Sequence, residues 1–174
     1  MTYAAVLIKP DAIRDILEEM ITNDLQTEAD VRIIFRKYWL IQKQLVKFIY
    51  PDWINKPEFP SMTHNLLQGQ SLLLIAKGGI NIYTTLQKAK GKMNQGGLRL
   101  KYRTKSIEEW ETLGFSGKAL RNKIAENRLH STDTLSETVM LCSLAMSSND
   151  IEKLSKIAPS LANLIWQSKM LCQT

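Results

Sequence analysis

Three apolar runs with strand character, each followed by a segment with helical spacing, constrain the fold of this chain more than any other feature. The runs cover residues 3–8, 31–40 and 70–76, and the third is the strongest strand pattern in the sequence. A last strand is expected to end at Leu129. Strands that alternate with helices predict a small α/β or α+β sandwich. The split βαβ arrangement of the ferredoxin-like type fits this order, although the pattern alone does not select it.

Helix signals fill the intervals between these strands. Pro10 and Asp11 open the first helix, because both residue types are favoured in a first turn, and apolar residues recur at helical spacing as far as residue 21. Thr134 and Glu137 have the spacing of a capping box and start another helix. Residues 91–102 are rich in glycine and basic side chains and predict an irregular loop. Further helices are expected at residues 41–49, 61–67, 80–90, 106–113, 118–126 and 150–166.

Length and composition indicate a globular cytoplasmic protein. The 174 residues fit one domain with a proper core, and a hydrophobic content of 44% argues against a disordered chain. The longest apolar run, residues 71–76, is too short to cross a bilayer, and Lys9 and Asp11 interrupt the N-terminus before a secretory signal develops. Cys142 and Cys172 form neither a metal-binding pattern nor a disulfide framework, so reduced thiols and no protein-bound metal are expected.

The net charge of +6 favours anionic partners, from nucleic acid to nucleotides. The basic residues are spread widely, without zinc-finger spacing, an aromatic RNA-binding signature or a basic arm. Nucleic acid is therefore not an expected partner, and the short apolar runs leave no membrane expected either. A surface that is basic without any such function explains the charge equally well.

Two polar segments carry the functional signal. They are VLIKPDA at residues 6–12 and NRLHSTDT at residues 127–134. Taken alone, His130 beside Asp133 and hydroxyl residues is typical of a turn or a helix cap. Taken together, the two segments resemble the opening strand-to-helix signature and the Asn-x-x-His active-site motif of the nucleoside diphosphate kinase family. The segment from Tyr50 to Phe59 resembles that family's nucleotide-clamping helical hairpin, and the resemblance covers about residues 3–146 in the right order.

The resemblance implies a fold and a domain organisation. The fold is an α+β, ferredoxin-like βαββαβ sandwich with a four-stranded antiparallel sheet and helices packed on it. One domain is expected over residues 1–174, with its core at about residues 3–146 and a helical C-terminal segment at residues 150–174. The family forms hexamers or tetramers, so a homo-oligomer is also expected.

The resemblance further implies phosphoryl transfer between nucleoside triphosphates and diphosphates by a ping-pong route, with Mg²⁺ bound through the nucleotide phosphates. His130 matches the histidine that takes the γ-phosphoryl group and passes it on, and neutral imidazole is a usable nucleophile at physiological pH. Lys9 matches the motif lysine at the end of the first strand, from which its ammonium can point into the site. Tyr50 is expected to pack beside His130 and orient it.

The nucleotide is expected to meet a further set of side chains besides Lys9. Asn127 would hold the sugar 3′-hydroxyl or a phosphate, and either Arg99 or Arg103 would bind phosphate. Glu58 stands where the family stacks an aromatic ring on the base. There are three alternatives. Phe59 stacks on the base instead, the base is held in another way, or the Glu58 carboxylate accepts hydrogen bonds from a particular base. The complete set is Glu58, Phe59, Met62, Lys88, Arg99, Arg103 and Asn127. The family's second arginine is replaced near Gln87 or Lys88, where Lys88 would substitute as a point charge but not as a bidentate fork.

Three more departures from the family pattern bear on activity. The phosphate-binding threonine is replaced near Met93 or Asn94. The glutamate that orients the family's histidine is replaced by Leu141, so control of the imidazole tautomer is lost unless Glu137, one helical turn earlier, serves instead. Residues 104–121 exceed the usual spacing before the Asn-x-x-His motif, and they would cover the site, bind a partner or alter a subunit contact.

The first hypothesis is an active but divergent nucleoside diphosphate kinase, because Lys9, Asn127 and His130 are all retained. The alternative is a nucleotide-binding or regulatory protein on the same fold with little or no phosphotransferase activity, which the residues Glu58 and Leu141 motivate. A phosphotransferase with a restricted nucleotide range is a third hypothesis.

Overall fold

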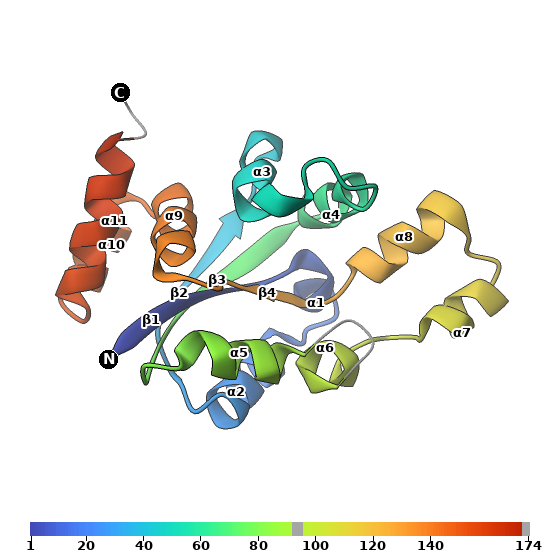
Figure 1. Cartoon of the computed structure of the whole chain (residues 1–174), viewed down its shortest axis with the longest axis horizontal. Helices are drawn as coiled ribbons and strands as arrows, with labels where there is room; N and C mark the ends of the chain where they lie inside the picture. The colour runs from blue at the N-terminus through green and yellow to red at the C-terminus, as the bar shows by residue number, and fades with distance from the viewer. Residues whose placement is uncertain (92–95, 172–174) are drawn as a thin grey trace.

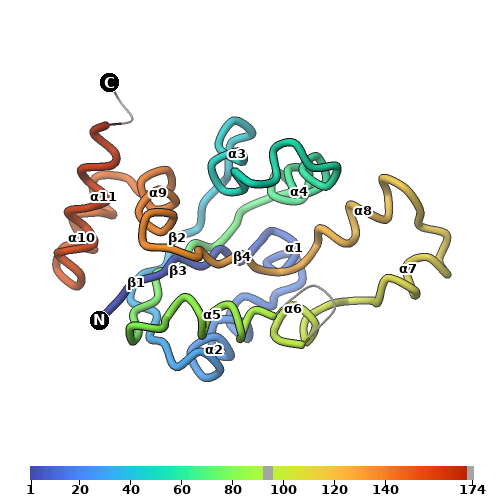
Figure 2. Tube along the Cα trace, in the orientation of Figure 1, coloured from blue at the N-terminus to red at the C-terminus, as the bar shows by residue number. Residues whose placement is uncertain are grey.

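A four-stranded antiparallel sheet lies at the centre of the computed structural model, which describes residues 1–91 and 96–171 (Figure 1). The strands are β1 (Thr2–Ile8), β2 (Arg32–Leu40), β3 (Gln70–Gly78) and β4 (Leu129–Ser131). Their order, β2-β3-β1-β4, is that of the ferredoxin-like sandwich, so the predicted α+β fold is confirmed. Figure 2 shows the orange trace of β4 running beside the blue trace of β1, although the two strands lie far apart in the sequence.

The inner strands β1 and β3 explain why two of the apolar runs are continuous. Both strands have neighbours on either side and helices over both faces, so nearly all of their side chains are buried. Along β1, Leu7 faces one core and Val6 faces the other, as the two-residue period of a strand requires. The edge strand β2 is more exposed, and a bulge between Ile33 and Phe35 interrupts its register with β3.

Helices cover both faces of the sheet. They are α1 (Pro10–Arg14), α2 (Glu18–Glu28), α3 (Val46–Ile49), α4 (Phe59–Leu66), α5 (Ile82–Lys90), α6 (Gly97–Lys101), α7 (Ile107–Thr112), α8 (Gly117–Ala125), α9 (Leu135–Ala145), α10 (Ser148–Ser155) and α11 (Pro159–Leu171). Short 3₁₀ turns precede and follow α3 at Lys43–Leu45 and Pro51–Trp53.

The helices form two layers with separate cores. α2 and α5 pack on one face of the sheet, where Leu25 and Leu86 meet the β3 side chain of Leu74. α3, α4 and α9 cover the other face, and α10 and α11 extend that layer by packing beside α9 (Figure 1). Cys142 lies unpaired in this second core, where burial raises the pKa of its thiol to about 12. Cys172 lies outside the described residues.

Three expectations about the helices were wrong in detail. The helix that begins at Pro10 ends after one turn and resumes at Glu18, because Ile16 takes a left-handed backbone conformation (φ +58°) that a helix cannot continue through. The region expected to be an irregular loop contains α6. Residues 150–166 belong to two helices, since Pro159 favours the start of a new helix.

The extra residues 104–121 form most of a helical arm. Ser106 and Glu109 cap α7 in a capping box, and the Trp110 ring meets the Phe115 ring edge-on at 5.1 Å. α7 extends away from the sheet in Figure 1, while α8 returns along α4 and leads into β4. The two helices predicted here are confirmed as α7 and α8, and they lie in the chain between α6 and the histidine strand β4.

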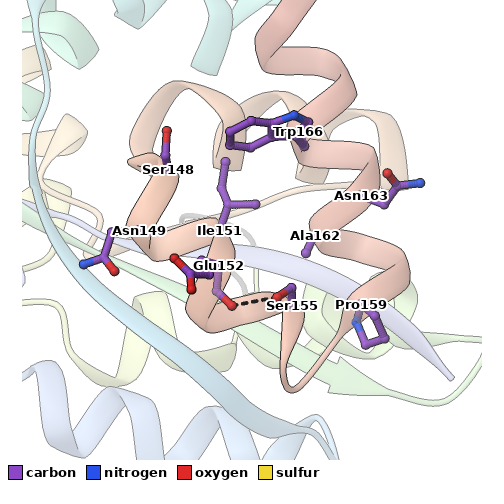
Figure 3. A pocket seen from close by; sticks show the side chains of 9 residues that line it. All are labelled: Ser148, Asn149, Ile151, Glu152, Ser155, Pro159, Ala162, Asn163 and Trp166. Carbon is purple, nitrogen blue, oxygen red and sulfur yellow. Dashed lines mark hydrogen bonds between the residues drawn. The ribbon is translucent and has the colours of Figure 1, made fainter.

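A groove of about 530 Å³ lies between α10 and α11, where Ile151, Ala162 and Trp166 line it (Figure 3). The Ser155 hydroxyl donates to the Glu152 carbonyl beside it at 2.7 Å. None of the residues that line this groove is among the predicted site residues. Within residues 1–91 and 96–171, no helix combines the length and apolar character needed to cross a bilayer.

Candidate active site

His130 lies at the middle of the short edge strand β4, opposite Leu7 of β1. Cross-strand partners share a face of the sheet, so the imidazole points to the same side as Leu7, towards the layer of α3, α4 and α9. Its neighbours Leu129 and Ser131 are buried, while His130 itself keeps partial exposure. The strand therefore fixes the position of the ring and leaves one side of it accessible.

Tyr50 lies beside His130 as expected. The two ring centroids are 5.0 Å apart and the planes meet at 76°, an edge-to-face contact. Burial raises the pKa of the Tyr50 phenol well above its ordinary value, so the hydroxyl remains protonated near neutral pH. Tyr50 belongs to the core that also contains Leu66 and Leu73. The buried ring of Tyr50 therefore limits the rotation of the imidazole.

The environment of His130 keeps its imidazole neutral. Burial lowers the pKa of this group well below 6.5, and the nearby positive charges of Lys90, Arg99 and Lys9 lower it further. A neutral imidazole has an unprotonated ring nitrogen with a free electron pair. The same three cations create a field that favours an anionic ligand beside that nitrogen.

Lys9 is completely buried at the end of β1, and its ammonium is directed at the segment just before β4. Nζ donates to the carbonyl oxygen of Ala125 at 2.9 Å and to Oδ1 of Asn127 at 2.8 Å. Burial lowers the pKa of Lys9 to about 8, and the charge of Asp11 opposes this effect. The two motif residues Lys9 and Asn127, expected in one site, are thus in direct contact.

Arg99 is the predicted arginine that acts on His130. Its Nε and Nη2 donate to the carbonyl oxygen of Leu129 at 3.2 and 3.0 Å, which fixes the guanidinium against the histidine strand. Arg103 lines a small cavity with Arg99, Glu126 and Asn127. Both candidate arginines therefore lie beside Asn127, and Arg99 is the one whose charge lowers the pKa of His130.

Lys90 is a site residue that sequence reasoning missed. Lys88, which was expected to supply a point charge, is exposed and is not among the charges that lower the pKa of His130. Two residues along a helix turn the side chain through about 200°, so Lys88 and Lys90 point to opposite sides. Ile82, Leu86 and Lys90 recur at four-residue spacing on the buried face of α5, and this periodicity was the signal that could have identified Lys90.

Arg128, inside the histidine motif, was also missed. It is 1% exposed, its backbone is left-handed (φ +69°), and its side chain carries a buried ion pair with Asp11. Nη1 donates to the Asp11 carbonyl at 2.7 Å and lies 2.8 Å from Oδ2 of Asp15, while Nε donates to the Tyr102 carbonyl at 2.8 Å. Arg128 therefore joins α1, α6 and β4 behind the site.

Glu137 and Leu141 both lie close to His130 and line one small cavity with it. The Glu137 carboxylate accepts a hydrogen bond from the Asp133 backbone N–H at 2.8 Å, while the Thr134 hydroxyl accepts from the Glu137 N–H at 3.1 Å. Glu137 thus serves the helix cap, and Leu141 is 3% exposed in the core. In the described part of the chain, no carboxylate accepts a hydrogen bond from a His130 ring nitrogen.

The residues expected at the base of the nucleotide are more dispersed. Glu58 is exposed at the cap position of α4, and Phe59 lines a groove of about 830 Å³ that Lys47 and Lys118 also line. Met62 is 9% exposed and packs in the core with Tyr50, so it supports the position of the Tyr50 ring more than it faces a ligand. Met93 and Asn94, named for the missing threonine, lie outside the described residues.

Comparison with known proteins identifies the family of the chain. The model of the nucleoside diphosphate kinase family matches residues 2–151. No curated protein matches the chain significantly by sequence.

Several solved structures of nucleoside diphosphate kinases share the fold. The apo enzyme of Encephalitozoon cuniculi has a TM-score of 0.64 and 18% identity, covering 86% of this chain and 92% of that one. The Borrelia burgdorferi enzyme, a transition state mimic with bound vanadate and ADP, has a TM-score of 0.65 and 14% identity, covering 86% and 89%. The Halobacterium salinarum enzyme in complex with CDP has a TM-score of 0.64 and 17% identity, covering 86% and 90%. The family match extends over most of the sequence, and the chain therefore belongs to the nucleoside diphosphate kinase family, whose members are phosphotransferases.

Proposed function

We propose that this protein is an active nucleoside diphosphate kinase that transfers the γ-phosphoryl group of a nucleoside triphosphate to a nucleoside diphosphate through a phosphohistidine at His130. The observation that carries the proposal is the state of His130: an imidazole held neutral, in contact with Tyr50 and within the field of Lys9, Lys90 and Arg99. A neutral nucleophile surrounded by cations suits a reaction in which an anionic group arrives and leaves.

The transfer runs in two matched steps. The electron pair of the unprotonated ring nitrogen attacks the γ-phosphorus, a nitrogen–phosphorus bond forms, and the bond to the bridging oxygen breaks. The nucleoside diphosphate leaves with that electron pair on its terminal oxygen. In the second step a terminal oxygen of another nucleoside diphosphate attacks the same phosphorus, and the ring nitrogen recovers its electron pair.

The chain's own residues position these reactants. Arg99 lies against the histidine strand and binds phosphate oxygens, and Lys9 holds Asn127 where it meets the sugar or a phosphate. Mg²⁺ enters as part of the magnesium–nucleotide substrate, since this ion prefers phosphate and water oxygens.

The experiment uses Mg²⁺ and γ-labelled ATP with the purified protein, quenched without acid. We expect acid-labile label on the wild type that a nucleoside diphosphate can remove as the triphosphate. His130→Ala takes up no label, and His64→Ala, which changes the exposed second histidine, is labelled like the wild type. Turnover retained in His130→Ala contradicts the mechanism.

A second candidate is a nucleotide-binding or regulatory protein without transfer activity. The engagement of the Glu137 carboxylate in the helix cap and the apolar Leu141 favour it, because neither side chain then controls the imidazole tautomer. Nucleotide binding by the wild type in a calorimetric titration, without label on His130, supports this candidate over the first.

We also propose that the chain is a cytoplasmic homo-oligomer. The free edge strand β2 supports self-association, because Tyr38 and Leu40 on it are 48% and 63% exposed. Light scattering coupled to size-exclusion chromatography measures the mass directly, and a monomer at all concentrations contradicts this part of the proposal.

A further inference from the structure

Lys90 is a buried cation without a partner in the described part of the chain. It is the last residue of α5 and is 7% exposed, and no hydrogen bond or ion pair to its ammonium is present within residues 1–91 and 96–171. Lysine is almost never this buried unless it is paired. α5 packs against β4, the strand that carries His130. The ammonium therefore lies close enough for its charge to lower the pKa of His130, and no described side chain uses its donors.

A contact between two glycines places Lys90 beside Arg99. Gly91 and Gly97 both have left-handed backbones, with φ of +72° and +71°. A Cβ at Gly91 would lie 2.1 Å from the Gly96 carbonyl oxygen, and a Cβ at Gly97 would lie 2.6 Å from the Gly91 Cα, so no side chain fits at either position. This close approach joins the end of α5 to the start of α6 (Figure 1). Lys90 and Arg99 are near enough for the charge of Arg99 to lower the pKa of Lys90.

Two like charges held close together inside a protein repel each other, and a nearby anion offsets that repulsion. Asp133 and Glu137 act on Lys90 from a distance, but the Glu137 carboxylate is occupied by the Asp133 backbone N–H. Burial and the charge of Arg99 lower the pKa of Lys90 to about 8, so the ammonium is mostly protonated at neutral pH. Asp133 and Glu137 offset this repulsion only in part, since the pKa of Lys90 remains lowered, and an anionic ligand would relieve it further.

We propose that Lys90 is a catalytic residue whose ammonium binds the phosphoryl group while that group moves between a nucleotide and His130. This inference rests on the proposed function and adds a residue to it. Nζ donates hydrogen bonds to non-bridging phosphoryl oxygens and keeps its proton throughout. Arg99 binds the same group from the histidine strand, so the two cations share the charge that the transfer redistributes.

The test compares Lys90→Met, Lys90→Arg and Lys153→Met, the last of which removes an equal charge from an exposed site on α10. Labelling of His130 by γ-labelled ATP in a single turnover is expected to slow by about 10- to 100-fold in Lys90→Met, the range for one lost charged hydrogen bond. Lys90→Arg keeps the charge and most of the rate, and Lys153→Met matches the wild type. Labelling of Lys90→Met at the wild-type rate overturns the proposal, as does a loss in Lys88→Met without one in Lys90→Met.

The ring resonances of His130 provide a readout that a structural role alone would not change. Removing a nearby positive charge should raise the pKa of His130 in Lys90→Met, while the pKa in Lys153→Met stays unchanged. An unchanged pKa in Lys90→Met counts against the placement of the ammonium.

Titration with pyrophosphate, followed through the same resonances, separates this inference from the proposed function. Weaker binding to Lys90→Met than to Lys153→Met supports Lys90 as the anion ligand even when the wild type takes up no label, and in that case the proposed function alone fails. Equal pyrophosphate affinity in the two variants overturns the role of Lys90.

Discussion

The side chains around His130 and those at the start of α4 differ in how strongly the fold fixes their positions. Lys9 and Lys90 are buried and Arg99 is half-buried, and the charges of all three act on the imidazole. Glu58 is exposed, and Phe59 lies in an open groove that α8 of the extra arm also borders. Buried charges need fixed positions, because a displaced one loses its compensation. Under the proposed function, the surroundings of His130 are the phosphate end of the site, which buried charges fix, and the start of α4 is the base end, which substitutions and the arm can change.

Replacement of Arg128 should have the largest effect, because it destabilises the fold around His130. Arg128→Met leaves the Asp11 carboxylate buried without its ion pair and should lower the free energy of unfolding by about 3–5 kcal/mol. Arg121→Met, at an exposed position on α8, should change it by less than about 0.5 kcal/mol. Urea unfolding measures both variants, and equal stabilities would show that the buried pair does not hold α1 to β4.

The pH dependence of the rate at which ATP labels His130 should reflect the charges of Lys9, Lys90 and Arg99. The pKa of His130 is lowered below 6.5, so the labelling rate should fall on acidification only below pH 6.5, where the imidazole gains its proton. The pKa values of Lys9 and Lys90 are lowered to about 8, so the rate should also fall as the pH rises through about 8 and the ammonium groups lose their protons.

Single-turnover labelling between about pH 5 and about pH 9.5 gives this profile. An acid limb centred above 6.5 would contradict the neutral, desolvated histidine. Lys90→Met should weaken the basic limb, since one of the two ammonium groups that produce it is gone.

The smallest effect is expected at the base end. Glu58→Ala should change the relative kcat/KM values for the four nucleoside diphosphates by about tenfold or less, because it alters one exposed side chain. The rate at which ATP labels His130 should change by less than about twofold, since Glu58 is not among the charges that act on the imidazole. Unchanged relative values across all four bases would remove Glu58 from the specificity argument.

The sequence predicted the parts of this molecule that local signals encode. The three long strands were located within one or two residues, and His130, Tyr50, Lys9 and Asn127 are brought together as expected. The roles of the remaining residues depend on contacts that no local pattern reveals. The glycine contact that sets Lys90 beside Arg99 spans residues that predict only a loop, and the Arg128 ion pair joins segments from opposite ends of the sequence.

The pairing of β4 with β1 has a consequence for how the protein becomes active. The bonds between Ala5 and Thr132 join residues 127 positions apart, among the longest separations that the folding chain must close. Such contacts close slowly, because the loop entropy must be overcome before they stabilise anything. His130 therefore reaches its place in the sheet only when β1 and β4 pair. Under the proposed function, the appearance of phosphorylated His130 during refolding would mark that pairing.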